Sequence, residues 1–398
     1  MTERRLMWQR PALRRDEDFE KDRAVGSLEL FFDLVFVVVI SRLADHLGGH
    51  HGPTDVLRFV VQFLAVFWVW NGFTFYTERF ESDGLENRLL TFASMLPVAG
   101  LAVFAEEGLQ DTYVGFAVAY LLARLVNQLS WARAGFHVPE FRPVAVRFHA
   151  GFALGTVIVV ASFATDGGLR VALFTVAVLA EIATPWFTTT LQSALPRLST
   201  SKFPERFAAF TIIVLGESVA GVIVGLSELR QRGELSVTGA VAGGLGLALG
   251  FSLWWIYFDF VARRAPKPVF LTALIWVYLH LVTLTAITAT GVGITLAVAG
   301  SVGGSLPDAS RYILVGSVVL GLLGIAAQQL TLARAADEPT HPRLSPALTA
   351  GVAVTLAVLG TLNLGWSGVG LLGALLAGMA VPMGYGAYVW FHAPGVDE

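Results

Sequence analysis

Apolar runs of about 20 residues recur along the whole sequence, and they limit the possible fold more than any other feature. A lipid bilayer accepts such runs as helices, because a helix satisfies its backbone polar groups within its own segment. Hydrophobic residues make up 55% of the 398 positions and charged residues only 14%. Typical soluble domains carry about 25% charged residues. The sequence therefore predicts an all-α, polytopic membrane protein.

We predict twelve transmembrane helices joined by short loops. The ninth run is overlong and contains Gly291 and Gly293, where we expect a bend or a break. Eleven or thirteen spans therefore stay open as alternatives. The predicted ranges are 27–46, 54–76, 87–105, 112–132, 143–164, 169–193, 205–226, 237–260, 269–298, 311–332, 346–362 and 368–391.

Composition and motifs exclude several classes of function. The chain has no cysteine, which excludes disulfides, thiolate metal ligands and cysteine nucleophiles. A net charge of -3 without a long basic tract argues against nucleic-acid binding. The motifs GxxxxGK[ST], HExxH and GxSxG are absent. We expect no cofactor and no metal, since the histidines of the loop LGGHHGP lack a fixed ligand spacing.

Basic residues are distributed unevenly between the two sides of the predicted membrane domain. Most of the 27 Lys and Arg residues fall in the N-terminal segment and in every second loop after it. The positive-inside rule then places both termini in the cytoplasm, and the protein in the plasma membrane. An odd number of spans would disturb this alternation, so the asymmetry also favours an even count.

The two halves of the sequence resemble each other. Glu29 and Glu205 each open a Phe-rich apolar run, and aromatic-rich segments precede both Arg79 and Arg263. Six helices per repeat would give two parallel repeats. We therefore predict a charged cytoplasmic N-terminal tail over 1–26, a first six-helix repeat over 27–198 and a second over 199–398.

Two carboxylates, Glu29 and Asp33, lie at the start of the first predicted helix, SLELFFDLVFVVVI. Four residues apart, they share one helix face. A carboxylate at the edge of a bilayer core is costly unless it finds a partner. The helix dipole favours Glu29, as it does Glu205, because both lie in first turns. Asp33 lies deeper, and we expect Arg88 or Arg206 to be its partner.

Four titratable residues fall near the middle of predicted helices: Arg124, Glu181, Glu217 and His280. Arg124 is expected to pair with Glu217 or Glu181, either as part of a pathway or as a salt bridge that fixes helix register. His280 is either a proton relay or, more often for a lone histidine, hydrogen-bonded packing. Proline at position 185 predicts a kink one turn after Glu181.

Arg124 has polar neighbours on one face of its own predicted helix. Tyr120, Asn127 and Gln128 lie at i−4, i+3 and i+4, so the stripe should face the interior of the bundle. Four tryptophans also lie inside their predicted helices rather than at the ends: Trp68, Trp70, Trp254 and Trp255. They serve either bundle packing or the aromatic lining of a substrate cavity.

Three segments carry a family resemblance: SLELFFDLVFVVVI, WVWNGFTFYTERF with ENRLLTFASML, and PERFAAFTIIVLGESV. Together they resemble the bacterial low temperature requirement protein A family over nearly the whole chain. The resemblance implies an integral membrane protein linked by name to growth in the cold, without an established biochemical activity. The positions that match the charged pattern of the family are Glu29, Asp33, Arg79, Arg88, Glu205, Arg206 and Glu217.

The favoured hypothesis is a transporter or channel for a small cation, proton or solute, with internal counter-charges at Arg88 and Arg124. The alternatives are an intramembrane or lipid-modifying enzyme that uses Glu29, Asp33 and Glu205, and a non-catalytic sensor or scaffold. Expected partners are the lipid bilayer and a small ion or solute, and a homo-oligomer stays open. The candidate pathway residues are Glu29, Asp33, Arg88, Arg124, Glu181, Glu205, Arg206, Glu217, Asp259 and His280.

Overall fold

A computed structural model describes residues 9–14, 25–81, 84–262, 264–334, 340–362 and 364–392, and the chain over these residues is almost entirely helical. Most of the predicted N-terminal tail, residues 1–8 and 15–24, lies outside the described residues, as does Arg263.

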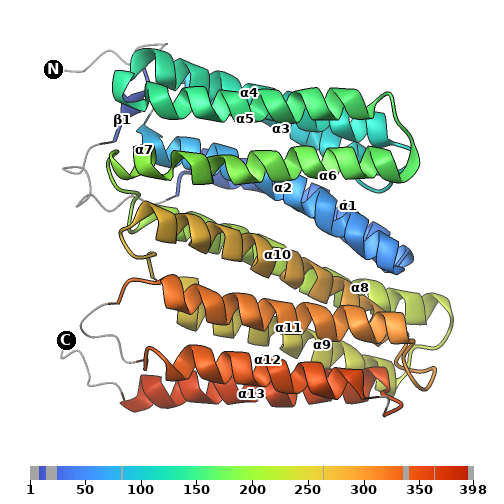
Figure 1. The fold of residues 1–398 in the computed structure, drawn as a ribbon. Coiled ribbons are helices and arrows are strands. Elements are labelled where there is room, and N and C mark those ends of the chain that lie inside the picture. Colours follow the sequence, from blue (N-terminus) through green and yellow to red (C-terminus); the bar gives the residue numbers. More distant parts are fainter. Residues whose placement is uncertain are drawn as a thin grey trace. The chain divides into compact units, whose positions relative to one another are not determined.

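Long helices occupy the positions that the apolar runs predicted, as Figure 1 shows. They are α1 (Ser27–Gly49), α2 (Pro53–Arg79), α3 (Leu85–Phe104), α4 (Tyr113–His137), α5 (Arg142–Ser162), α6 (Gly167–Ala183), α8 (Lys202–Gln231), α9 (Val237–Tyr257), α10 (Phe270–Ala299), α11 (Asp308–Thr331), α12 (Leu344–Thr361) and α13 (Gly368–His392). Shorter elements are the strands β1 (Ala12–Leu13) and β2 (Phe80–Glu81), the 3-10 turns η2 (Pro139–Phe141) and η3 (Thr184–Thr188), the helix α7 (Thr189–Ser193) and the π-helical η4 (Phe258–Ala262).

Within the described residues, 10 helices are long and apolar enough to cross a membrane. The long helices α1 and α4 are not among them. Glu29 and Asp33 lie on α1, and Arg124, Asn127 and Gln128 lie on α4, so these helices carry the polar residues singled out above. A membrane domain with many apolar helices is therefore established, and the count of twelve spans stays a prediction.

The predicted interruption after Glu181 is present. Helix α6 ends at Ala183, and the chain continues as the 3-10 turn η3 and the short helix α7. Pro185 lacks a backbone N–H and cannot donate to the preceding turn, which ends the α-helical ladder here.

The predicted break at Gly291 and Gly293 is wrong, because α10 runs unbroken past both glycines. Both positions serve close helix packing instead. A Cβ at Gly291 would lie 2.6 Å from the backbone oxygen of Glu217 on α8, and one at Gly293 would lie 2.7 Å from Leu314 Cα on α11. Small residues at helix contacts are typical of membrane bundles.

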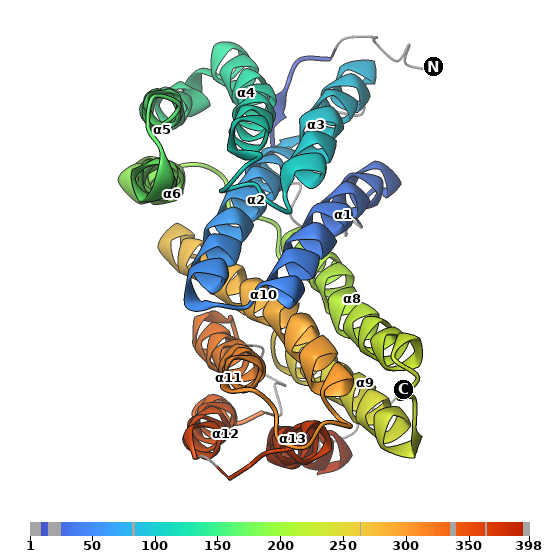
Figure 2. The same ribbon diagram turned by 90° about the vertical axis from the view of Figure 1, so that its right-hand side faces the viewer.

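The chain forms two compact units, each assembled from separated segments. Unit 1 comprises the described residues up to Leu43, then Leu57–Arg206 and Pro268–Leu274, and unit 2 comprises Ala44–Val56, Phe207–Lys267 and the described residues from Ile275 onward. In unit 1, α3 packs on α4, α4 on α5 and α5 on α6, and α2 is buried along most of its length. In unit 2, α11 packs on α12, α12 on α13 and α13 on α9, as Figure 2 shows end-on. The internal duplication over 27–198 and 199–398 stays a prediction.

Loops that the sequence predicted on one side of the membrane meet within unit 1. Strand β1 pairs antiparallel with β2, which follows α2. Arg14 is buried and donates to Glu78 at 3.2 Å, and Glu78 also accepts from the backbone N–H of Ser199. Part of the N-terminal segment is thus folded against the end of α2. The cytoplasmic orientation of this end stays a prediction.

Glycine contacts in unit 2 lead to a stability prediction. Replacing Gly221 on α8 by Ala is expected to destabilise the protein by about 1–3 kcal/mol, as overpacking does. The added methyl group would overlap the backbone oxygen of Gly291 and lie 2.9 Å from Thr295 Oγ1. Thermal unfolding in detergent measures the effect. Gly216→Ala is the matched control on the same helix, because nothing lies within 4 Å of a Cβ there. Equal unfolding temperatures for the two variants would contradict the packing described.

Candidate functional site

Asp33 is fully buried and is held by two donors from distant parts of unit 1. Its Oδ1 accepts from Trp70 Nε1 at 2.8 Å and from Arg206 Nη2 at 2.8 Å. Its Oδ2 is buried without a hydrogen-bond partner. Of the two partners predicted for Asp33, Arg206 is therefore the one that the structure places beside it.

Glu29 extends this contact into a balanced group of charges. Its Oε1 lies 2.9 Å from Lys202 Nζ and 3.3 Å from Arg206 Nη1. Its Oε2 accepts from the backbone N–H of Gly26 at 2.9 Å, at the start of α1. We call Glu29, Asp33, Lys202 and Arg206 the α1–α8 charge cluster. Two carboxylates and two cations leave the cluster without net charge.

Arg88 and Glu205 are not part of this buried cluster. Both side chains are exposed. The expectation that Arg88 serves as an internal counter-charge is therefore wrong. Glu205 precedes Arg206 on α8, and consecutive helical residues point about 100° apart. Since Arg206 points into unit 1, Glu205 points away from it.

Arg124 pairs with Glu181, which was one of the two predicted partners. Arg124 Nε lies 2.5 Å from Glu181 Oε2, and both residues are buried. Arg124 Nη1 also lies 3.5 Å from the Trp68 carbonyl oxygen and 3.4 Å from Asn127 Oδ1. The pair connects α4 with the end of α6. The other candidate, Glu217, belongs to unit 2.

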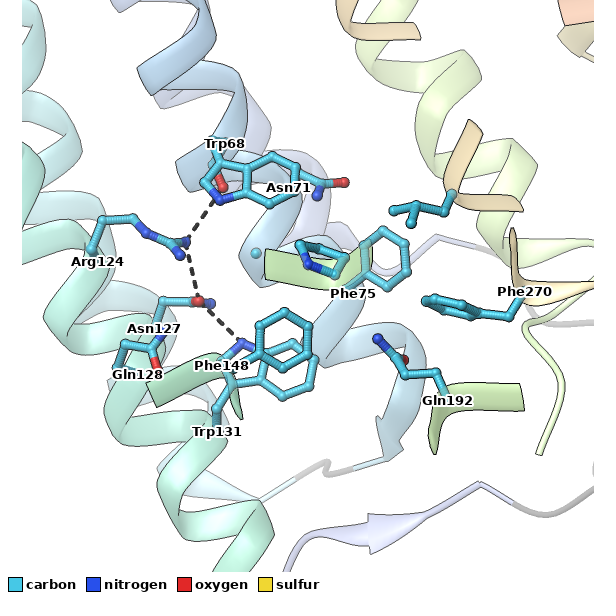
Figure 3. A pocket seen from close by; sticks show the side chains of 13 residues that line it. Trp68, Asn71, Phe75, Arg124, Asn127, Gln128, Trp131, Phe148, Gln192 and Phe270 are labelled. Carbon is cyan, nitrogen blue, oxygen red and sulfur yellow. Dashed lines mark hydrogen bonds between the residues drawn. The ribbon is translucent and has the colours of Figure 1, made fainter. Parts of the chain in front are cut away.

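A cavity lies beside Arg124, and Figure 3 shows the side chains that line it. It holds about 430 Å³ of space outside protein atoms, including its mouth. Its wall combines aromatic rings with amide groups and one guanidinium group. We call it the unit 1 cavity, lined by Trp68, Asn71, Gly72, Phe75, Arg124, Asn127, Gln128, Trp131, Phe148, Pro185, Gln192, Phe270 and Leu274.

Asn127 presents a hydrogen-bond donor without a partner in the described part of the chain. Its Oδ1 receives Trp131 Nε1–H at 3.1 Å and Arg124 Nη1–H at 3.4 Å. Both neighbours are donors, so this end of the amide must be the oxygen. The other end, Nδ2, is therefore the donor, and it is buried without a partner.

Asn71 on α2 provides the complementary group. The residue is 4% exposed, and its Oδ1 is a buried acceptor without a partner among the described residues. Gly72, next to it, allows α4 to approach α2 closely. A Cβ at Gly72 would lie 2.7 Å from Asn127 Oδ1 and 2.8 Å from Arg124 Nη1. Buried polar groups normally have hydrogen-bond partners, so two unpartnered polar atoms at one cavity indicate a place for a ligand or for water.

His280 in unit 2 has both ring nitrogens hydrogen-bonded. Nδ1 lies 2.9 Å from the Trp276 carbonyl oxygen, and Nε2 lies 2.9 Å from the Tyr257 hydroxyl oxygen. A carbonyl oxygen only accepts, so Nδ1 carries the hydrogen and Nε2 accepts from Tyr257. This arrangement favours the packing interpretation of His280 over the proton relay.

The remaining candidates lie in unit 2. Glu217 is buried on α8, whereas Asp259 is exposed in η4 and accepts from Trp255 Nε1 at 2.7 Å. The expected grouping of Glu29, Asp33 and Glu217 is thus divided between units. Among the described residues, no group of three His, Asp or Glu side chains is placed to hold a metal ion.

A family model described as bacterial low temperature requirement A protein matches residues 24–381. The chain belongs to this LtrA family. The match includes every helix that forms the α1–α8 charge cluster and the unit 1 cavity. A relative, an uncharacterized protein of Rhizobium meliloti (strain 1021), is 27% identical to this LtrA protein over 286 residues, which is 67% of each chain.

Sequence reasoning missed two residues at these sites, Lys202 and Asn71, and it assigned Trp70 to bundle packing or to a cavity lining rather than to Asp33. Asn71 had a usable signal, because it interrupts the aromatic run WVWNGF in the middle of an apolar helix. Lys202 had none, and nothing indicated that Trp70 would lie beside Asp33. An indole or an ammonium group acquires its role here only when helices far apart in the sequence pack together.

Proposed function

We propose that this LtrA protein is a membrane transport protein whose solute site is the unit 1 cavity. One observation carries the proposal: two unpartnered amide atoms and Arg124, whose charge is paired with Glu181, line a cavity among helices of which α2 and α10 can cross a membrane. A charged residue at the centre of a membrane helix costs about 2.5–3.5 kcal/mol on insertion scales. A polar solute that binds these groups accounts for their presence.

A proton is the coupling ion that the surroundings of Asp33 support. Asp33 Oδ2 is buried without a partner, and an anionic oxygen in that position is costly. Protonation removes this cost. A metal cation would instead meet the positive charges of Arg206 and Lys202, and it would need further oxygen ligands.

The alternatives receive less support. An intramembrane enzyme based on Glu29, Asp33 and Glu205 needs these carboxylates in one accessible site, but Asp33 is fully enclosed and Glu205 is exposed. A pure scaffold has no use for a cavity with a free donor and a free acceptor. The full proposal places twelve spans in the plasma membrane, with both termini in the cytoplasm.

Reconstitution into liposomes that contain a pH-sensitive dye tests the function. A panel of inorganic cations, sugars, amino acids and uncharged aromatic solutes is added outside. We expect at least one solute to drive proton movement, and we expect Asp33→Asn to abolish the coupling. Glu205→Gln, at an exposed position of the same end of α8, is the control and should behave like the wild type. Folded protein that moves neither protons nor any member of the panel would overturn the proposal.

A further inference from the structure

We infer that the unit 1 cavity binds an uncharged, flat aromatic solute that carries a hydrogen-bond acceptor next to a donor, as aromatic amides do. The inference rests on the proposed transport function for its biological meaning. The binding itself can be measured independently of transport.

The charges around the cavity favour a neutral ligand. The guanidinium group of Arg124 is the charged group in the cavity lining, and Glu181 already balances it at 2.5 Å. Both members of the pair are buried. A carboxylate or an ammonium ligand would bring an unmatched charge into a space with largely aromatic walls, where burial of a charge is strongly unfavourable.

The hydrogen-bonding groups define the polar part of the ligand. Asn127 Nδ2 offers a donor from α4, and Asn71 Oδ1 offers an acceptor from α2. Each is buried without a partner among the described residues. A carbonyl oxygen accepts from the first, and an N–H of the same amide donates to the second. An amide or lactam group therefore carries the partner that each of the two atoms lacks, and satisfying buried polar groups is favourable.

The walls define the apolar part. Trp131 and Phe148 stack with ring centroids 5.3 Å apart, and Trp68, Phe75 and Phe270 complete the aromatic lining. Figure 3 shows that these rings come from several helices around one space. Aromatic rings pack well on other flat rings, in stacked or edge-to-face geometry. The walls therefore favour a flat ring system over a branched or flexible group.

A charge series on the wild-type protein is the primary test. Benzamide, benzoate and benzamidine share one ring and nearly one size, but they carry zero, negative and positive charge. Equilibrium binding to the purified full-length protein in detergent is measured for each, with toluene as the apolar reference. We expect benzamide to bind about tenfold or more tightly than the other three. Absence of benzamide binding, or binding of benzoate or benzamidine at equal affinity, would overturn the inference.

Variants then locate the site. Asn127→Leu and Asn71→Leu should each weaken benzamide binding about tenfold, because each removes one hydrogen bond. Gly72→Ala should weaken it too, since its methyl group would displace Asn127 and Arg124. Gly168→Ala is the control in unit 1, where nothing lies within 4 Å of a Cβ. Unchanged binding in both Asn variants would place the ligand elsewhere and overturn the inference.

The two proposals can fail separately. Selective benzamide binding without any flux in liposomes would remove the transport function and leave the ligand class standing. Proton-coupled flux of a solute outside this class, without benzamide binding, would support the transport function and overturn the ligand class.

Discussion

Replacing Arg124 by Leu is expected to lower the free energy of unfolding by about 3–5 kcal/mol, because it leaves the Glu181 carboxylate buried without its cation. The two groups lie 2.5 Å apart, and both residues are almost completely buried. Unfolding of the protein in detergent, by heat or by a denaturing surfactant, measures the loss. Most surface substitutions change stability by less than about 0.5 kcal/mol, so this effect stands out clearly.

The double variant Arg124→Leu with Glu181→Leu is the decisive control. Removing both charges leaves no unpaired ion, and buried ion pairs replaced by apolar residues of similar size are often neutral for stability. We therefore expect the double variant to regain most of the lost stability. If it also loses transport, the pair serves solute binding as well as helix register. A single Arg124→Leu variant as stable as the wild type would contradict the pairing.

Replacing Arg206 by Met is expected to lower the free energy of unfolding by a similar amount, again about 3–5 kcal/mol. Asp33 would keep only the Trp70 N–H as a donor, and its charge would remain in a fully buried position. Glu29 would keep Lys202 at 2.9 Å. The loss should be smaller at low pH, since protonation removes the charge on Asp33.

Two comparisons test the Arg206 result. Adding Asp33→Asn to the Arg206→Met variant removes the unpaired charge and should recover much of the stability. Glu205→Gln, one residue away on an exposed side of α8, should leave the unfolding temperature unchanged. An Arg206→Met variant that Asp33→Asn makes still less stable would show that Arg206 acts through a different partner.

The two ion pairs have a common structural consequence. Asp33 and Arg206 are 173 positions apart in the sequence, and Arg124 and Glu181 are 57 apart. Each pair joins helices that sequence order does not bring together. We expect such pairs to select one helix register, because a slip by one turn leaves two charges unpaired in an apolar environment.

Local patterns in the sequence determined the helices and their approximate ends. The thickness of the bilayer core sets the length of an apolar run, so hydropathy alone locates membrane spans. The span predicted over 237–260, for example, is formed by α9 up to Tyr257 and continues into the π-helical η4. Proline at position 185 predicted the end of α6 for an equally local reason, the missing N–H. The polar stripe around Arg124 followed from helical periodicity, and Asn127 and Gln128 are buried as expected.

Only the tertiary structure decided which groups meet. Glycines such as Gly291 can break a helix or allow close packing, and here α10 is unbroken while the Glu217 backbone oxygen lies 2.6 Å from the place that a Cβ at Gly291 would take. The sequence left Glu181 and Glu217 open as partners for Arg124, and it contained no signal for Trp70 beside Asp33. The unit 1 cavity likewise exists only where α2, α4, α5, η3, α7 and α10 contribute side chains to one space. Partner choice and cavities depend on long-range packing, whereas helix formation in lipid depends on the segment itself.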